Sequence, residues 1–321
     1  MKQLQFTAPA PDGSATVVAD VVDPTPGPGE VLIEVTHAGV NFKDVMVRRG
    51  DPEYAAAWPA VAGLEVAGVV RSVGPGAVAP PVGSRVVALT NLHGLAGLVV
   101  VPAQLVVPTP ASVSDELAAT VPGAWATPQL LLRRLPRDGG RVLVHSAAGG
   151  VAQAVAQLAA RHGVVELVGA VGSPGRVQAA EASGYDEVHV RGQDLVERVG
   201  ARRFDLVLDP LGTEHLGKDV EMTAPGGVVV LFGNAGGGAS EPLPTHPELM
   251  SRNVGLAGFS VNALSAVRPD LVRAAMSEVL DAMAQGEVRG AVTVLHGLDQ
   301  ARVAHDALAS GRAPGKYVIA L

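Results

Sequence analysis

The stretch HSAAGGVAQAVAQLAARHG, from His145 to Gly163, begins with small residues and continues with good helix formers. It includes the end of the apolar segment RVLVH, so a buried strand is expected to pass directly into a helix. A diphosphate can bind at a helix N-terminus only where no side chain blocks the backbone N–H groups. The positions of a glycine fingerprint fall on Ser146, Gly149 and Ala152, and only the middle one is glycine. The stretch indicates a dinucleotide-binding loop, with a tight turn that binds nothing as the alternative.

Small and basic residues follow the next apolar segment, VELVGAV, at the end where an adenosine ribose would lie. A site for NAD generally places an acidic residue there, but Glu166 stands at the opposite end of the segment. Ser173 can donate a hydrogen bond to a 2′-phosphate, and Arg176 can form an ion pair with it. Arg191, just after the segment DEVHV, adds a second positive charge. This pattern predicts NADPH rather than NADH, unless Arg176 lies only on a solvated helix start.

The elements that would position these loops alternate regularly between residues 141 and 260. Helical or loop stretches separate six apolar segments: RVLVH, VELVGAV, DEVHV, FDLVLD, GVVVLFG and VGLAGFS. Strands that alternate with crossovers predict a mostly parallel sheet covered on both faces. Six such strands suit a doubly wound dinucleotide fold, which we expect to span residues 119–261.

The rest of the chain predicts a second domain, as its length of 321 residues also suggests. Short apolar segments with Gly and Pro between them indicate an antiparallel, barrel-like sheet in residues 1–118. A long helix, PDLVRAAMSEVLDAMAQG, precedes AVTVLH, LDQARVAHDALASG and KYVIAL, which read as a strand, a helix and a strand. We expect residues 262–321 to return to the first domain.

Composition limits the partners and the compartment. Lys and Arg number 24 against 31 Asp and Glu, and no basic stripe occurs, so nucleic acid is not an expected partner. Cysteine is absent, which excludes disulfides and thiolate metal sites. The N-terminal stretch MKQLQFTAPAPDGS has no apolar signal segment, and the longest uncharged stretches contain Pro or Gly–Gly. We expect a cytoplasmic protein that does not enter the membrane.

Several separated motifs carry a family resemblance across nearly the whole chain. They are HAGVNFKDVMVRRG, GLEVAGVVRSVGPG, VLVHSAAGGVAQAVAQLA, GGVVVLFGNAGG and GKYVIAL, in this order. The chain resembles the zinc-independent medium-chain dehydrogenase/reductase superfamily, in particular its quinone oxidoreductase and enoyl reductase branch. The resemblance implies an α/β protein, with a GroES-like β-barrel-type catalytic domain and a Rossmann domain with a doubly wound parallel sheet.

The resemblance also implies a reaction. An NADPH-dependent, zinc-independent oxidoreductase would deliver hydride to an activated conjugated acceptor, such as a quinone, an enone or an enoyl thioester, in the cleft between the domains. Zinc-dependent relatives carry a Cys near Val40 and a His at the position of Leu64, so no metal is expected here. Many relatives are homodimers paired through an edge strand of the Rossmann sheet, and we expect the same of this chain.

Four residues near the first motif are the catalytic candidates. The resemblance places Asn41 near the nicotinamide ribose and the substrate, although asparagine is also common in turns. Lys43 could donate a proton or orient a thioester carbonyl, or be a solvated lysine. Asp44 could hold Asn41 or Lys43 in place, or cap the following helix. Tyr54 could supply a proton or serve in packing.

The resemblance and the two loops together give the cofactor candidates. Thr127 would contact the cofactor, or cap a helix, and Phe259 would wall the nicotinamide, or belong to the core. His145 is expected to be a satisfied structural histidine, and His37, His93 and His305 are given no metal role. The full set of cofactor candidates is Asn41, Thr127, Ser146, Ala147, Gly149, Gly150, Val151, Ser173, Arg176, Arg191, Phe232, Gly233, Asn234, Phe259 and Lys316.

Three departures from the family pattern keep other functions open. Ala152 stands where the branch usually has Gly, ATPQLLL lacks the usual Tyr after Thr127, and GLAGLVV replaces a segment with Phe or Tyr. The NFKDVM and HSAAGG motifs are similar to those of enoyl reductase domains, so a trans-acting enoyl reductase or tailoring enzyme of a polyketide pathway is one alternative. A non-redox or repurposed cofactor-binding protein on the same fold is the other.

Overall fold

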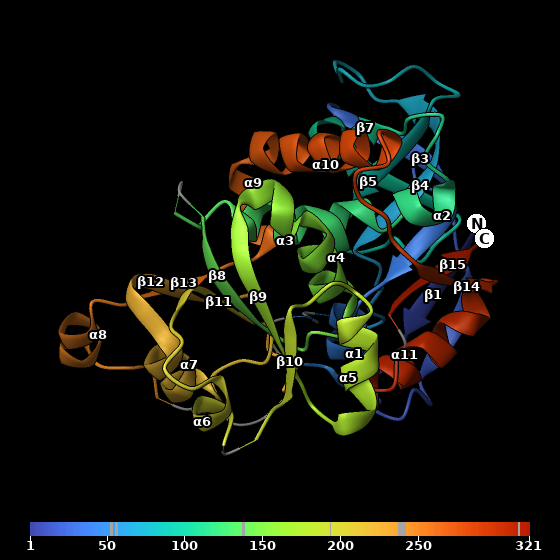
Figure 1. The fold of residues 1–321 in the computed structure, drawn as a ribbon. Coiled ribbons are helices and arrows are strands. Elements are labelled where there is room, and N and C mark those ends of the chain that lie inside the picture. Colours follow the sequence, from blue (N-terminus) through green and yellow to red (C-terminus); the bar gives the residue numbers. More distant parts are fainter. Residues whose placement is uncertain (52–53, 55–56, 137–138, 193, 237–241, 314) are drawn as a thin grey trace. The chain divides into compact units, whose positions relative to one another are not determined.

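A computed structural model describes residues 1–51, 54, 57–136, 139–192, 194–236, 242–313 and 315–321 (Figure 1). The chain divides into two compact units. Unit 1 comprises Met1–Thr127 and Val261–Leu321, and unit 2 comprises Pro128–Ser260. None of the described helices is long and apolar enough to cross a membrane.

Unit 1 is built on a seven-stranded sheet in which six strands follow the order β14-β15-β3-β4-β5-β7, while β6 pairs with β3. The C-terminal strand β15 lies antiparallel to β3, with Tyr317 opposite Val40, and β14 lies parallel to β15. The C-terminal segment thus lies in the same sheet as the N-terminal strands of unit 1. The strands of unit 1 are β1 (Lys2–Phe6), β2 (Thr16–Asp20), β3 (Glu30–Val40), β4 (Glu65–Val73), β5 (Arg85–Leu89), β6 (Leu98–Pro102), β7 (Val106–Pro108), β14 (Val292–His296) and β15 (Lys316–Ala320).

Short helices connect these strands, and one long helix follows the return of the chain to unit 1. The core of the unit contains buried side chains from β1, β3 and β4, among them Phe6, Ile33 and Val66. The helices are α1 (Phe42–Arg49), η1 (Ala103–Leu105), α2 (Asp115–Ala118), η2 (Val121–Trp125), α9 (Val261–Val267), α10 (Pro269–Ala284), η5 (Leu298–Gln300) and α11 (Ala301–Ala309), and α3 (Ala126–Leu132) runs on into unit 2.

Unit 2 is a six-stranded, fully parallel sheet in the order β10-β9-β8-β11-β12-β13. The order reverses between β8 and β11, as in a doubly wound fold, which confirms the predicted fold class of this half. Its elements are β8 (Gly140–His145), α4 (Gly150–Leu158), η3 (Ala159–His162), β9 (Val164–Val171), η4 (Pro174–Arg176), α5 (Val177–Glu181), β10 (Glu187–Val190), α6 (Leu195–Val199), β11 (Phe204–Asp209), α7 (Leu216–Met222), β12 (Thr223–Leu231), α8 (His246–Arg252) and β13 (Gly255–Gly258).

The helix after β8 shows how the sequence sets an element. Helix α4 begins at Gly150, and a 3₁₀ turn extends it as far as Gly163, which has a φ of 72° and caps the end. Ala154, Val155 and Leu158 are buried, because their spacing places them on one helical face. The predicted strand-to-helix transition is confirmed. The N-terminus of helix α4 lies at the carboxyl end of β8.

Candidate functional site

The parallel sheet of unit 2 gathers most of the cofactor candidates at one edge. Carboxyl ends of parallel strands meet at the same edge of a sheet, and this is where doubly wound folds bind their ligands. The candidates that directly follow β8, β9, β10, β12 and β13 are Ser146, Ala147, Gly149, Gly150, Val151, Ser173, Arg176, Arg191, Phe232, Gly233, Asn234 and Phe259. The structure therefore brings these twelve residues to one end of unit 2.

The loop after β8 is shaped so that backbone N–H groups lie open at the start of α4. Ser146 has a φ of 57°, in the left-handed region, and its carbonyl accepts a 2.8 Å hydrogen bond from the N–H of Gly149. A Cβ atom at Gly149 would lie 3.1 Å from the same carbonyl oxygen. The first intrahelical bond is donated by Gln153 to Gly149, so the preceding N–H groups have no acceptor within the helix. An anionic group fits this helix start.

Ala152, the residue at the third fingerprint position, packs without difficulty. It is buried, and its carbonyl accepts a 2.9 Å hydrogen bond from the hydroxyl of Tyr185. The close approach falls instead at Gly169 on β9, where a Cβ atom would come within 2.7 Å of the Cβ of Ala147. Glycine is therefore needed on the strand, and alanine is tolerated on the helix.

Two arginines lie at the ends of β9 and β10. The Nη2 atom of Arg176 donates a 3.0 Å hydrogen bond to the carbonyl of Ala148, which ties the end of β9 to the loop after β8. Ser173, which precedes the 3₁₀ turn η4 that contains Arg176, is exposed. Arg191 is half-buried, and its Nη1 atom has no hydrogen-bond partner within the described part of the chain. Both guanidinium groups belong to the same edge of unit 2 as the glycine-rich loop.

A buried cluster that the sequence analysis missed lies under this edge. His145 Nε2 lies 2.7 Å from Asp219 Oδ1, and both side chains are fully buried. Asp209 ends β11 and is also fully buried. The Nδ1 atom of His145 has no partner among the described residues, so the prediction of a satisfied structural histidine holds for only one ring nitrogen. An acidic residue at the end of the apolar run FDLVLD was the available signal.

In unit 1, Asn41 is held in a buried network that fixes its side-chain amide. Its Nδ2 atom donates to the carbonyl of Gly39 at 3.2 Å and to Glu65 Oε1 at 3.0 Å. Its Oδ1 atom accepts a 2.7 Å hydrogen bond from Lys316 Nζ. Both amide hydrogens are therefore used, and Oδ1 keeps one lone pair with which Asn41 can accept a further hydrogen bond.

Glu65, at the start of β4, is the residue on which this network depends. It is fully buried and forms an ion pair with Lys316 at 2.5 Å. Its Oε2 atom accepts hydrogen bonds from the N–H groups of Gly123, at 2.6 Å, and Ala124, at 3.2 Å. The sequence analysis did not single out Glu65, and its position in the second family motif was the only signal.

Lys316 was predicted to bind the cofactor, and the structure gives its ammonium three acceptors within unit 1. They are the carbonyl of Val40 at 2.7 Å, Asn41 Oδ1 at 2.7 Å and Glu65 Oε1 at 2.5 Å. An ammonium has three N–H donors, and all three have acceptors here. This geometry favours a role in which Lys316 positions Asn41 and does not itself contact the cofactor.

The remaining catalytic candidates also lie around helix α1. Asp44 accepts hydrogen bonds from the N–H groups of Asn41, at 2.8 Å, and Gly63, at 3.0 Å, so it holds the start of the helix. Lys43 Nζ donates a 2.7 Å hydrogen bond to the carbonyl of Asn91, and burial lowers the pKa of Lys43 despite the opposing charge of Asp44. Tyr54 packs against the core of unit 1. Thr127 is buried in α3 and ends unit 1.

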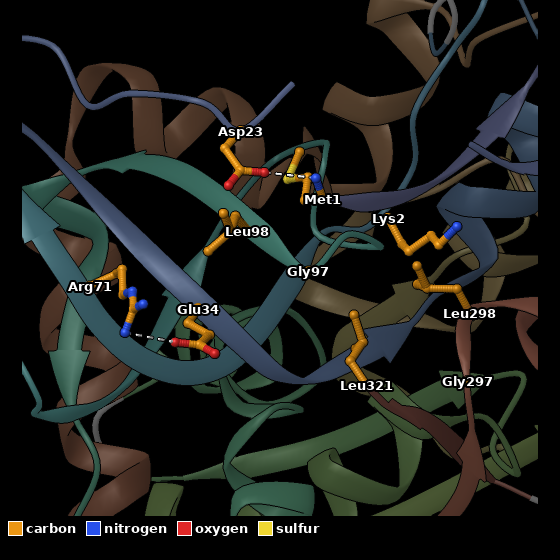
Figure 2. A pocket seen from close by; sticks show the side chains of 10 residues that line it. All are labelled: Met1, Lys2, Asp23, Glu34, Arg71, Gly97, Leu98, Gly297, Leu298 and Leu321. Atoms are coloured by element: carbon orange, nitrogen blue, oxygen red, sulfur yellow. Dashed lines mark hydrogen bonds and ion pairs between the residues drawn. The ribbon is translucent and has the colours of Figure 1, made fainter. Parts of the chain in front are cut away.

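A surface hollow of 570 Å³ also lies on unit 1, and Figure 2 shows the side chains around it. Two ion pairs border it, one between Met1 and Asp23 and the other between Arg71 and Glu34. None of the predicted site residues lines this hollow, and the side chains of Asp23, Arg71 and Glu34 are more than half exposed. It has no apparent connection with the chemistry discussed above.

Comparison with known proteins identifies both halves of the chain. The model of the alcohol dehydrogenase GroES-like domain matches residues 27–111, and that of zinc-binding dehydrogenase matches residues 183–319. The human synaptic vesicle membrane protein VAT-1 homolog-like is 30% identical over 317 residues, which are 92% of this chain and 75% of that protein. The polyketide synthase component PikAII of Streptomyces venezuelae is 32% identical over 315 residues, which are 94% of this chain and 8% of that protein.

Solved structures agree with these matches. The crystal structure of Escherichia coli quinone oxidoreductase complexed with NADPH has a TM-score of 0.87 and 25% identity, and the match covers 100% of both chains. The GroES-like sheet of unit 1 and the doubly wound sheet of unit 2 agree with these matches. The chain therefore belongs to the zinc-independent medium-chain dehydrogenase/reductase superfamily of oxidoreductases, in its quinone oxidoreductase branch.

Proposed function

We propose that the protein is an NADPH-dependent, zinc-independent reductase that delivers hydride to an activated conjugated acceptor, such as a quinone, an enone or an enoyl thioester. The observation that carries the proposal is the helix start at Gly150 and Val151, whose N–H groups have no acceptor within the helix and which follows the loop bound by Arg176. Small side chains around this start leave room for a diphosphate. The nicotinamide cofactor, when bound, supplies the hydride.

The end of β9 supports a preference for NADPH. Ser173 and Arg176 stand where an NAD site would carry an acidic side chain, and Arg191 follows at the next strand end. We assign Arg176 and Arg191 to the 2′-phosphate, with Ser173 as an additional donor. The Escherichia coli relative, whose structure contains NADPH, points in the same direction.

The contacts within unit 1 support distinct proposed roles for Asn41 and Lys43. Because both Nδ2 hydrogens of Asn41 are used, this residue can only accept a further bond, for which a ribose hydroxyl is the suitable donor. It cannot donate to a substrate carbonyl. Lys43 is the suitable donor, since the Asn91 carbonyl takes only one of its three N–H groups and burial eases the loss of its proton.

The acceptor could be bound as a thioester to a carrier. The match to PikAII extends over 94% of this chain, which favours an enoyl thioester over a free quinone. A trans-acting enoyl reductase or tailoring enzyme of a polyketide pathway is therefore the second candidate. Lys43 suits this substrate, because an ammonium can stabilise the enolate oxygen of a thioester.

We also propose a homodimer paired through β13, the edge strand of the parallel sheet. An edge strand offers unpaired backbone groups to a second copy. The segment that precedes it carries exposed apolar side chains, with Leu243 59% and Met250 66% exposed. Sedimentation of the wild type should give the dimer mass, and Met250→Glu should shift it toward the monomer.

Oxidation of NADPH with three acceptors tests the proposed reaction. We expect turnover with 1,4-benzoquinone, an enone or a crotonyl thioester, and a strong preference for the thioester over the other two acceptors would favour the second candidate. NADPH binding without turnover of any acceptor would instead support a repurposed cofactor-binding protein. No binding of either nicotinamide cofactor would contradict both enzymatic readings.

A further inference from the structure

Three buried ionisable side chains meet at the carboxyl ends of the two central strands of unit 2. His145 ends β8, Asp209 ends β11, and Asp219 lies in α7. Each is at most 1% exposed. His145 Nε2 lies 2.7 Å from Asp219 Oδ1, and the charges of His145 and Asp219 both act on the carboxyl group of Asp209. The three side chains form one buried cluster.

The buried cluster leaves two carboxyl oxygens without a donor from the described part of the chain. Asp209 Oδ1 accepts a 2.6 Å hydrogen bond from the N–H of Leu211, and Asp219 Oδ1 faces His145. The two Oδ2 atoms have no hydrogen-bond partner among the described residues. Two ionised carboxylates in one buried cluster repel each other, so a proton on one of them is favoured.

The charged groups around Asp209 come from several elements. His145 faces it from β8, Asp219 from α7, and Arg191 and Glu214 influence the same cluster from the loops after β10 and before α7. The ring of His215 stacks on that of His145, with centroids 5.9 Å apart. Burial raises the pKa of Asp209 to about 7; the charge of His145 opposes this and that of Asp219 adds to it. Asp209 is therefore poised to exchange a proton near neutral pH.

The pKa of His145 is also raised. Burial alone would lower it, but the charge of Asp219 and its hydrogen bond, together with the charge of Asp209, outweigh burial. The raised pKa favours the charged form of His145 beside Asp219. The proton that is exchangeable near neutral pH is assigned to Asp209.

The position of the cluster connects this proton to the cofactor. Strands β8 and β11 flank the point where the strand order reverses, and a dinucleotide is bound outside the carboxyl ends at this point. Ser146, the first residue of the open loop, directly follows His145. A bound diphosphate brings negative charge to the same edge, and negative charge makes ionisation of a nearby carboxyl group less favourable.

We propose that the buried cluster of His145, Asp219 and Asp209 links nicotinamide dinucleotide binding to the uptake of one proton from solvent, with Asp209 as the group that takes it up. The inference rests on the proposed function, because it requires the cofactor at this edge. When Asp209 is ionised, binding draws a proton onto it, so the affinity falls as the pH rises. When Asp209 already holds its proton, binding takes up none.

Calorimetric titration with NADH tests the proposal. NADH is chosen because it lacks the 2′-phosphate, whose own pKa of about 6 would add a second proton change. Titrations in buffers with different ionisation enthalpies give the number of protons taken up. We expect an uptake that approaches one proton above neutral pH, and an affinity that falls by at most about tenfold per pH unit, the limit for one proton.

Two variants locate the proton. Asp209→Asn should bind NADH with little proton uptake and little dependence on pH. Asp194→Asn is the matched control, because the Asp194 side chain is 46% exposed and forms an ion pair with Arg198, and it should behave as the wild type. Persistent uptake in Asp209→Asn would overturn the assignment.

The wild-type protein alone also decides the matter if Asp209→Asn fails to fold. NADH or NADPH binding without proton uptake between neutral and mildly alkaline pH would overturn this inference and leave the proposed function intact. No binding of either dinucleotide would overturn both.

Discussion

Lys316 Nζ and Asn41 Oδ1 lie 2.7 Å apart, although 275 residues separate them in the chain. Glu65 completes the contact, since it pairs with the ammonium and accepts from the amide. The last strand of unit 1 and the first turn of α1 thus depend on one buried carboxylate. Asn41 is presented in a single orientation as a result.

Removal of Glu65 should therefore destabilise unit 1. Glu65→Gln leaves the Lys316 ammonium buried without its counter-charge, which costs about 3–5 kcal/mol. Urea unfolding should show a lower midpoint, and the double variant Glu65→Gln with Lys316→Met should recover part of the loss. A single variant as stable as the wild type would contradict the proposed importance of this ion pair.

Asn41→Ala should lower kcat/KM by a factor on the order of 10 or more, which corresponds to the loss of one good polar contact. The effect should appear with every acceptor, because Asn41 is assigned to the ribose. Steady-state kinetics measure it, and thermal unfolding verifies that the variant is folded. Unchanged kinetics in a folded variant would remove Asn41 from the site.

Lys43→Ala should impair enone or thioester reduction more than quinone reduction, since a quinone needs less help with its proton. Only the ammonium form of Lys43 can donate, so the rate should fall as the pH rises through its pKa. Burial lowers that pKa, so the fall should begin at a lower pH than for an exposed lysine.

The pH–rate profiles of wild type and Lys43→Ala measure this difference. Lys2→Ala is a suitable control, because the Lys2 side chain is 61% exposed. Equal losses with all acceptors would assign Lys43 a structural role in place of proton donation.

NADPH should bind more tightly than NADH by about 10- to 100-fold, the contribution of a charged hydrogen bond of roughly 1.5–3 kcal/mol. Arg176→Ala should remove most of this difference, and Arg191→Ala part of it. Fluorescence titration with both cofactors measures the ratio, with exposed Arg198→Ala as the control. If the ratio is unaffected by both substitutions, neither arginine binds the 2′-phosphate.

Turnover should survive exhaustive chelation, because Leu64 occupies the position of a zinc ligand in related enzymes and the chain has no cysteine. Activity measured after treatment with a strong chelator should match that of the untreated protein. A requirement for stoichiometric zinc would show that another set of side chains binds the metal.

Residues at strand ends could be predicted from the sequence, and residues that act through long-range contacts could not. Ser146 and Arg176 follow apolar segments that are recognised as strands from their pattern. The carboxyl ends of parallel strands lie at the same edge of the sheet, so the two residues could be placed there. Glu65 lies inside a motif that reads only as a strand, and its partner Lys316 is brought to it by the pairing of β15 with β3. No local pattern in the sequence announces such a contact.

The buried cluster shows the same limit at shorter range. His145 looked like an ordinary core histidine, because a sequence does not show which side chains the crossovers bring against a strand. Its partner Asp219 comes from α7, on the crossover between β11 and β12. Asp209 could have been noticed, because an acidic residue at the carboxyl end of an apolar strand is placed for ligand chemistry.

The pairing of β15 with β3 also determines an order of events in biosynthesis. Strand β3 is synthesised early, yet its neighbour in the sheet is the last strand of the chain. Residues 128–260 make their contacts among themselves and can become compact while the ribosome is still at work. Unit 1 must wait with an open strand edge until β15 has been synthesised. Contacts of such long sequence separation form slowly, so this waiting interval is where the nascent protein is most exposed to aggregation.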